Sequence, residues 1–159
     1  MKGETRLYPD IEKWLENYLR DRYKRWNIET THKTSKIALD VVLKEKGIEI
    51  KEAIGLGIKV DIVGILTRKS EVKLALVEVK DKPLTLRDLG QLWGYTQLLN
   101  PVESFLISSK GLGTLTYILK VLKREDLLVF GPKREKMMKI ANWDERRKSI
   151  DYATLIPKL

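Results

Sequence analysis

Cysteine is absent from this 159-residue chain, and histidine occurs once, at His32. Without cysteine there can be no disulfide, thiolate nucleophile, iron–sulfur cluster or cysteine-ligated zinc. A single histidine, which we expect on the surface, excludes a multi-histidine metal site and argues against a Ser-His-Asp triad. Any metal must therefore be held mainly by carboxylates, which favours a hard cation such as Mg²⁺ or Mn²⁺.

Long apolar runs are also lacking. The first residues, MKGETRLYPD, contain no apolar segment of the kind found in signal peptides, and no stretch is long and apolar enough to span a bilayer. We therefore expect an intracellular, cytoplasmic protein with no membrane partner. Glycine-rich GxGxxG and P-loop motifs are missing too, so nothing indicates a nucleotide cofactor.

Positive charge is what the chain has in excess. It carries 31 Lys and Arg against 22 Asp and Glu, a formal net charge of +9. This excess favours a polyanionic partner, with nucleic acid before an anionic membrane, although a solvated basic surface would give the same count. With 43% hydrophobic residues, the chain can fold around one core. Its richness in Lys, Glu, Ile and Leu would also suit a thermophile.

Strand and helix patterns alternate along the chain and predict an α/β domain with a central mixed sheet flanked by helices. The predicted elements are a helix over 8–26, a strand over 27–33, a segment over 36–46 that fits helix or strand, a hairpin of strands over 59–67 and 72–80, a helix over 85–100, a strand over 103–109, a helix around 115–122 and a strand over 126–131.

The pattern weakens after residue 131, and basic residues become frequent. We therefore divide the chain into a core over 1–131 and a basic C-terminal extension over 132–159 that packs on the same domain. The extension could also bind nucleic acid or form the contact of a homodimer.

The clearest chemistry lies in the predicted hairpin. Asp61 is on its first strand, and Glu78 and Lys80, two residues apart, share one face of its second strand. Two carboxylates on neighbouring strands can hold one Mg²⁺ together with the backbone carbonyl of Val79. A lysine on the same face can orient the attacking water and stabilise negative charge. Each residue alone is more commonly an edge or turn residue or part of an exposed ion pair, but the combination is harder to explain in that way and favours phosphodiester hydrolysis.

The next predicted helix carries Arg87, Gln91 and Tyr95 at intervals of four residues along one flank. A strip formed by Gly90 and Gly94 lies beside them and allows another backbone or a nucleic acid to approach closely. The residues that we expect to contact nucleic acid are Arg22 at the basic end of the first helix, Lys82, Arg87, Tyr95, and Lys110 in the turn before a later helix.

The segments VDIVGI, LVEVKDK and QLWGY together resemble the PD-(D/E)xK nuclease superfamily, which has the restriction-endonuclease-like fold. QLWGY is similar to the QxxxY motif of its RecB-type branch. The resemblance implies Mg²⁺-dependent hydrolysis of DNA, with Asp61 and Glu78 as metal ligands and Lys80 as the catalytic lysine. It also implies that Gln91 supports the metal site and that Tyr95 contacts the phosphate backbone.

Members of this superfamily often add a glutamate from the first helix. Glu12 is the candidate because it falls inside the apolar stripe of that helix, from where it would reach the metal through a water; Glu16, at the edge of the stripe, is the alternative. Without the resemblance, Glu12 would be read as a charge favoured by the helix dipole. The chain departs from the family pattern at Val60, which replaces proline, and lacks the cysteine cluster of the iron–sulfur members.

The sequence thus predicts a metal-dependent DNA endo- or exonuclease that attacks with a metal-activated water. A Holliday-junction resolvase, which would act as a dimer on the same fold, is an alternative within this class. A non-catalytic nucleic-acid-binding protein is the alternative from another class, although such a protein has no need for both carboxylates and the lysine.

Overall fold

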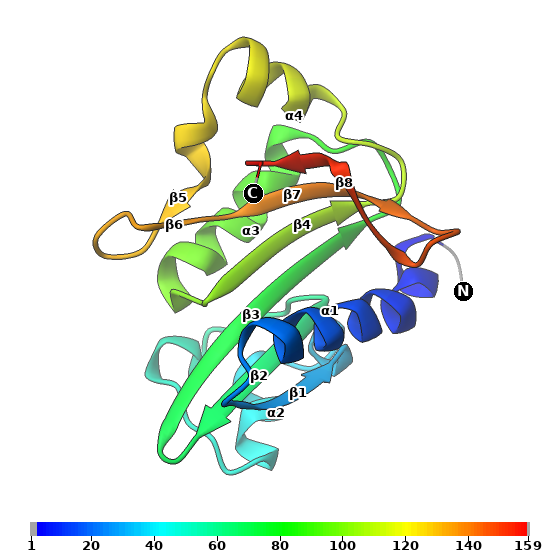
Figure 1. The fold of residues 1–159 in the computed structure, drawn as a ribbon. Coiled ribbons are helices and arrows are strands. Elements are labelled where there is room, and N and C mark those ends of the chain that lie inside the picture. The colour runs from blue at the N-terminus through cyan, green and yellow to red at the C-terminus, as the bar shows by residue number, and fades with distance from the viewer. Residues whose placement is uncertain (1–2, 159) are drawn as a thin grey trace.

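A six-stranded mixed sheet with helices on both faces forms the centre of the molecule, as seen in a computed structural model that describes residues 3–158 (Figure 1). The strands of the sheet, in chain order, are β1 (Asn27–Thr31), β2 (Ile62–Arg68), β3 (Glu71–Lys80), β4 (Glu103–Ser108), β7 (Lys139–Asp144) and β8 (Ser149–Ile156). They lie side by side in this same order. The pairs β3–β4 and β4–β7 are parallel, and the other pairs are antiparallel.

The remaining elements are the helices and one small sheet. The α-helices are α1 (Tyr8–Arg22), α2 (Leu39–Glu45), α3 (Leu86–Leu99) and α4 (Thr114–Thr116), the last continued by a π-helical turn, η4 (Tyr117–Val121). The 3₁₀ turns are η1 (Gly3–Leu7), η2 (Lys33–Ser35), η3 (Lys51–Ala53) and η5 (Glu125–Leu128). A separate two-stranded sheet pairs β5 (Val129–Phe130) with β6 (Lys136–Met137). Among residues 3–158, no helix has both the length and the apolar character needed to cross a bilayer.

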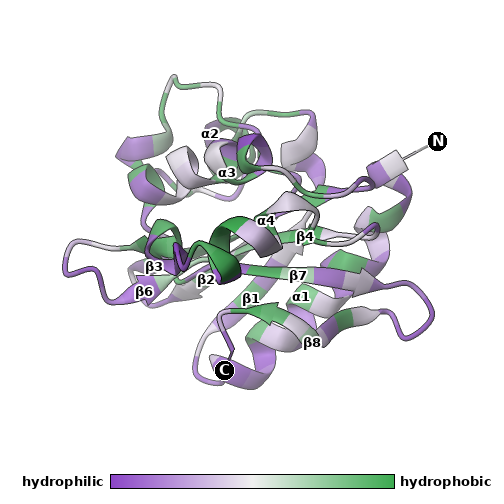
Figure 2. Cartoon of the chain, turned by 90° about the horizontal axis from the view of Figure 1, so that it is seen from above, coloured by the Kyte–Doolittle hydropathy of each residue, from purple (hydrophilic) through white to green (hydrophobic). Residues whose placement is uncertain are grey.

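Apolar side chains fill both faces of the central sheet. On one face, α1 buries Leu15 and Leu19 against the strands, as its apolar stripe predicts. On the other face, α2, α3 and α4 bury a second cluster that includes Leu92 and Leu106. Figure 2 shows the same arrangement from above, with α1 on one side of the hydrophobic strands and α2 and α3 on the other. Because both faces are covered, the only open parts of the sheet are its edges and the ends of its strands.

The structure confirms the predicted α/β class, the mixed sheet and the hairpin of β2 and β3. It also confirms Thr85 as the N-cap of α3, where the Thr85 hydroxyl accepts a hydrogen bond from the Asp88 N–H and the Asp88 carboxylate accepts one from the Thr85 N–H. The predicted alternation on β3 holds, since Leu74 and Leu76 face one cluster and Ala75 faces the other.

Several predicted boundaries were wrong. The first strand of the hairpin begins at Ile62 rather than at 59, so Asp61 lies in a bend before the strand. The first helix ends at Arg22, and the segment over 36–46 is helical only from Leu39. Of the strand predicted over 126–131, only β5 is extended, because the residues before it form η5. The segment over 132–159 supplies β7 and β8, which complete the central sheet.

Gly64 in β2 lies directly against the leucine side chains of α1. A Cβ atom added there would lie 2.5 Å from Cδ1 of Leu19 and 3.3 Å from Cβ of Ala75. Because Leu19 is fully buried, it has little room to move away. We expect Gly64→Ala to lower the free energy of unfolding by about 1–3 kcal/mol, measured by urea denaturation.

The matched control is Gly90→Ala on α3, where an added Cβ would meet no atom within 4 Å. Alanine is the better helix former, so this variant should gain about 0.5–1 kcal/mol. A Gly64→Ala protein as stable as the wild type would show that α1 does not pack as closely as described.

Candidate functional site

Asp61 occupies the position where the ladder between β2 and β3 ends. The last paired residues are Ile62 and Val77, and beyond them the Asp61 side chain continues the pairing. Its Oδ2 accepts a hydrogen bond from the N–H of Val79 at 2.8 Å, and its own N–H donates to Oε1 of Glu78 at 3.2 Å. The bend therefore holds the Asp61 carboxylate against the end of β3 and beside Glu78.

Glu78 and Lys80 project from the same face of β3, as predicted. The Lys80 ammonium lies 4.0 Å from Oε2 of Glu78, and the two side chains are only 16% and 6% exposed. Burial raises the pKa of Glu78 to about 8; the negative charge of Asp61 adds to this effect, whereas Lys80 opposes it. Without a further cation, the Glu78 carboxyl group therefore keeps its proton near neutral pH.

Tyr8 and Glu4, which the sequence analysis missed, complete the surroundings of the pair. The Tyr8 hydroxyl donates a hydrogen bond to Oδ1 of Asp61 at 2.8 Å. Burial, and then the charge of Asp61, raise the pKa of Tyr8 far above its usual value, so the phenol remains a donor. Burial also raises the pKa of Glu4; Lys80 opposes this shift and Asp61 adds to it. Tyr8 could have been found, because it shares the apolar stripe of Ile11.

Glu12 contacts His32 and Thr30 rather than the carboxyl pair. Its carboxylate contacts Nδ1 of His32 at 2.7 Å and accepts a hydrogen bond from the Thr30 hydroxyl at 3.2 Å. The His32 ring in turn lies 5.9 Å from the Tyr8 ring, measured between centroids. Glu12 thus reaches Asp61 only through His32 and Tyr8. His32 is half-exposed, as expected for a surface residue.

Glu16 is even less connected to the site. Its carboxylate pairs with Arg20 at 2.9 Å, and Lys13 lies 3.9 Å from it on the same helix. Among the described residues, no hydrogen bond or ion pair joins either candidate glutamate of α1 to Asp61 or Glu78. The contribution of α1 to the carboxyl pair is therefore Tyr8, at the first residue of the helix.

Among the described residues, those predicted on α3 make no polar contact with the carboxyl pair. Arg87 and Gln91 are exposed, and Tyr95 is half-buried against the cluster that α3 covers. Within residues 3–158, none of these three side chains makes a hydrogen bond or ion pair with Asp61 or Glu78. They therefore take no direct part in shaping the carboxyl pair.

Lys82, a predicted nucleic-acid contact, is held by a buried partner. Its ammonium lies 2.6 Å from Oδ2 of Asp88, whose side chain is 8% exposed. Burial would raise the pKa of Asp88, but hydrogen bonds from Lys82 and Thr85 outweigh burial and lower it. Asp88 therefore stays ionised and neutralises much of the Lys82 charge. We expect Lys82 to fix the start of α3 more than to attract DNA.

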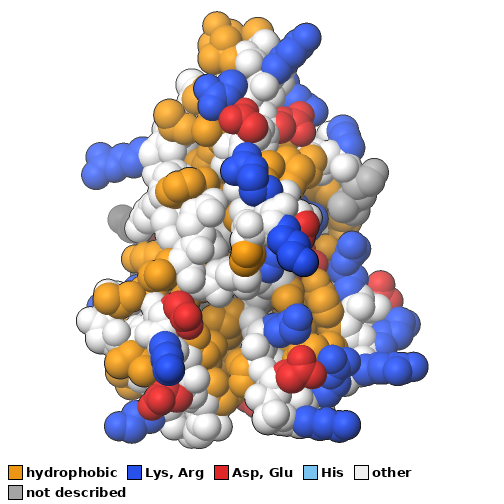
Figure 3. All heavy atoms as spheres, turned by 90° about the vertical axis from the view of Figure 1, so that its left-hand side faces the viewer, with side chains coloured by type: hydrophobic (Ala, Val, Ile, Leu, Met, Phe, Trp, Pro, Cys, Tyr) orange, Lys and Arg blue, Asp and Glu red, His pale blue; other side chains and the backbone are white. Residues whose placement is uncertain are grey.

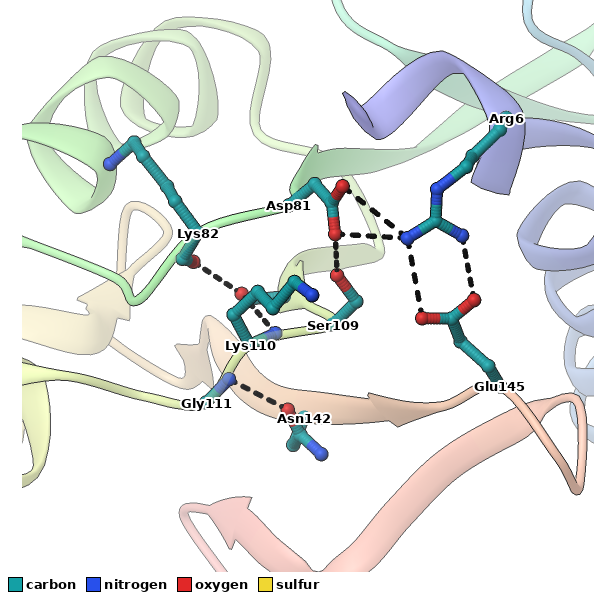
Figure 4. A network of polar contacts seen from close by, with 9 residues as sticks. Arg6, Asp81, Lys82, Ser109, Lys110, Gly111, Asn142 and Glu145 are labelled. Carbon is teal, nitrogen blue, oxygen red and sulfur yellow. Dashed lines mark hydrogen bonds and ion pairs between the residues drawn. The ribbon is translucent and has the colours of Figure 1, made fainter. Parts of the chain in front are cut away.

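A polar network fixes the end of β3 directly after Lys80 (Figure 4). Asp81 accepts hydrogen bonds from Arg6 at 3.2 Å and from the Ser109 hydroxyl, and Arg6 also binds Oε1 of Glu145 at 2.6 Å. The bond from Ser109, followed by the charge of Arg6, lowers the pKa of Asp81 against the opposing effect of desolvation. The Ser109 N–H donates to the Lys80 carbonyl at 3.1 Å. The network thus ties η1, β3, β4 and the turn after β7 together around Lys80.

Lys110 and Arg22 lie at opposite ends of the sheet. Lys110 is exposed and follows the end of β4, close to Asp81 in the network. Arg22 lies 3.9 Å from Glu103, which is paired with Ala75. Because Ala75 precedes Lys80 by 80 − 75 = 5 residues, that end is roughly 17 Å from the site. Of these two residues, only Lys110 lies at the end of the sheet that carries the carboxyl pair.

The donors around Asp61 and Glu78 fit a hard divalent cation. Both carboxylates supply oxygen. The Val79 carbonyl points to the same side of β3 as its N–H, toward Asp61, because both groups of a strand residue face one neighbour. Among residues 3–158, no three His, Cys, Asp or Glu side chains are grouped to hold a metal. Water would have to complete the coordination, as it usually does for Mg²⁺.

Comparisons of the chain with models of protein families, with curated protein sequences and with solved structures found no match. The functional interpretation therefore depends on the geometry and electrostatics of the site.

Basic residues do not gather at the end of the molecule opposite the site. Figure 3 shows that face, where Lys and Arg side chains are scattered among hydrophobic and acidic ones. The net charge of +9 is therefore not collected into one patch there.

Proposed function

We propose that the protein is a metal-dependent deoxyribonuclease of the PD-(D/E)xK type, built on a restriction-endonuclease-like core. The observation that carries this proposal is the contact between Asp61 and Glu78, with the Lys80 ammonium 4.0 Å from Glu78. Burying the Glu78 carboxyl group beside a second carboxylate destabilises its charged form. A divalent cation removes this cost, whereas a protein that only binds nucleic acid gains nothing from such a pair.

Asp61, Glu78 and the Val79 carbonyl would hold Mg²⁺ or Mn²⁺. When bound, such a cation neutralises phosphate charge and lowers the pKa of a water. The Lys80 ammonium stabilises negative charge on the scissile phosphate and orients the attacking water. Tyr8 keeps the Asp61 carboxylate in one orientation through its hydrogen bond.

The surroundings of the pair suit a DNA backbone. The exposed Arg87, in the first turn of α3, and Lys110, just after the end of β4, would contact the phosphates. Contacts of this kind position the backbone without reading its sequence. Gln91 and Tyr95, exposed and half-buried on α3, would complete the contact on the same side.

The test is cleavage of single-stranded, duplex, flap and four-way-junction DNA in Mg²⁺, Mn²⁺ or EDTA. The wild type should cleave at least one form, and only with metal. Asp61→Asn should lose at least about 100-fold in rate, because it weakens the metal site. Asp21→Asn, which removes a charge from a side chain 83% exposed on α1, should cleave like the wild type.

No cleavage of any DNA form by the wild type, or equal rates for the wild type and Asp61→Asn, would contradict the proposal. Cleavage confined to the four-way junction would identify the resolvase alternative, and its dimeric state could then be checked by sedimentation.

A further inference from the structure

A pocket of about 390 Å³ opens beside the carboxyl pair, between η1 and η2. Its lining residues are Thr5, Tyr8, His32, Lys33, Ser35, Lys36 and Ile37. Tyr8 belongs to both places, since its ring lines the pocket while its hydroxyl binds Asp61 at 2.8 Å. The volume is at the lower end of the range for small-molecule sites, so it suits one nucleotide rather than a duplex.

Flat and apolar groups form one wall of the pocket. The rings of Tyr8 and His32 are 5.9 Å apart and inclined at 50°, and the Ile37 side chain is 40% exposed beside them. Glu12 holds the His32 ring through its 2.7 Å contact with Nδ1. The ring is therefore fixed in place before any ligand arrives, which reduces the entropy lost on binding. Glu12, which does not contact the carboxyl pair, thus has the role of orienting His32.

Two cations without a partner border the pocket. Lys33 and Lys36 are exposed, and among the described residues no carboxylate lies within ion-pair distance of either ammonium. Other lysines are paired, such as Lys46 with Glu29 at 2.7 Å. An apolar wall with an unpaired cationic rim suits a ligand that has a flat ring and a phosphate.

We infer that this pocket binds one unpaired nucleotide of single-stranded DNA. The base stacks on the His32 ring, and Lys33 and Lys36 bind the flanking phosphates. A paired base could not expose its faces in this way, whereas an unpaired base can stack on an aromatic side chain whatever its identity. The inference depends on the proposed function for the choice of DNA as ligand. It adds a preference for single strands, because only an unpaired base can enter the pocket. Tyr8 places this pocket next to Asp61.

The test measures binding of a short fluorescent oligothymidylate and of a blunt DNA hairpin by anisotropy, in EDTA so that no metal-dependent cleavage occurs. His32→Ala should weaken single-strand binding by about 10-fold and leave duplex binding unchanged. His32→Phe, which keeps a stacking ring, should bind within about twofold of the wild type.

Lys33→Ala/Lys36→Ala should weaken single-strand binding and reduce the slope of log affinity against log salt by about 1.4, as expected for two lost phosphate contacts. The control Lys51→Ala/Lys133→Ala removes two exposed charges elsewhere and should keep the wild-type slope to within about 0.3.

Single-strand binding that is the same in His32→Ala as in the wild type would overturn the inference. So would an equal loss for duplex, or an equal loss in the control variant. Cleavage by the wild type together with any of these results would leave the proposed nuclease function intact. The expected binding pattern without any cleavage would instead support the pocket and contradict the nuclease.

Discussion

Replacing Glu78 by glutamine will abolish metal-dependent cleavage and will at the same time stabilise the protein. Cleavage should fall at least about 1,000-fold, because the amide is a poor ligand for a hard cation and leaves the metal one carboxylate short. The folded state should gain stability because a buried group with a strongly raised pKa no longer has to ionise. A residue that serves only the fold would not show these opposite effects.

The gain in stability should depend on pH with a definite sign. Burial raises the pKa of Glu78 from its usual 4.5 to about 8 in the folded state. Between these pH values, the unfolded chain has already lost the proton that the folded protein keeps. The folded state binds more protons, so the free energy of unfolding of the wild type falls as pH rises through this interval. Glutamine removes this dependence.

Thermal melts in EDTA measure the effect. The melting temperature of Glu78→Gln minus that of the wild type should be near zero below about pH 4.5 and greatest above about pH 8. Adding Mg²⁺ should stabilise the wild type and not the variant. Glu71→Gln, at the exposed start of the same strand, is the control and should leave cleavage unchanged. A difference that shrank with rising pH would show that Glu78 is not held in its protonated form.

Lys80→Met should lower the cleavage rate by about 10²–10⁴-fold while leaving metal binding in place. Methionine fills much of the same space, but it cannot stabilise negative charge or orient water. Because Lys80 also opposes the rise in the Glu78 pKa, its loss should raise that pKa further. The variant should therefore require a higher pH than the wild type to bind Mg²⁺.

Rates at saturating Mg²⁺, together with calorimetric titration of the metal, separate these two effects. Lys73→Met, from an exposed position on the same strand, is the control and should cleave like the wild type. A Lys80→Met protein with the wild-type rate at saturating metal would show that the ammonium takes no part in the chemistry.

The part of the site that lies on β3 could be predicted because alternation along a strand fixes which side chains share a face. Glu78 and Lys80 are in phase, and their neighbours on β3 are buried on opposite faces as expected. The start of α3 was predictable for a similar local reason, since Thr85 and Asp88 form a capping box. Both signals depend only on residues close together in the chain.

Other features depend on contacts between distant elements. Alternation cannot show where a ladder ends, so the bend at Asp61 was read as strand. The angle of Glu12 on α1 was read correctly as inward. Its position along the helix, about 6 Å beyond Tyr8, places it against His32 instead of Asp61. Strand β8 was missed because its pairing with β7 shifts between Ile140 and Asn142, and the extra residues break the period of two on β8: Ile150 and Leu155, five residues apart, lie in the same cluster.

The most direct test of the central claim is a crystal structure of the protein grown with Mn²⁺, in which anomalous scattering locates the metal. The account predicts a peak at about 2.0–2.3 Å from one carboxylate oxygen each of Asp61 and Glu78, with the Val79 carbonyl as a further ligand. Mn²⁺ bound elsewhere, or no bound metal at a concentration that supports DNA cleavage, would contradict it.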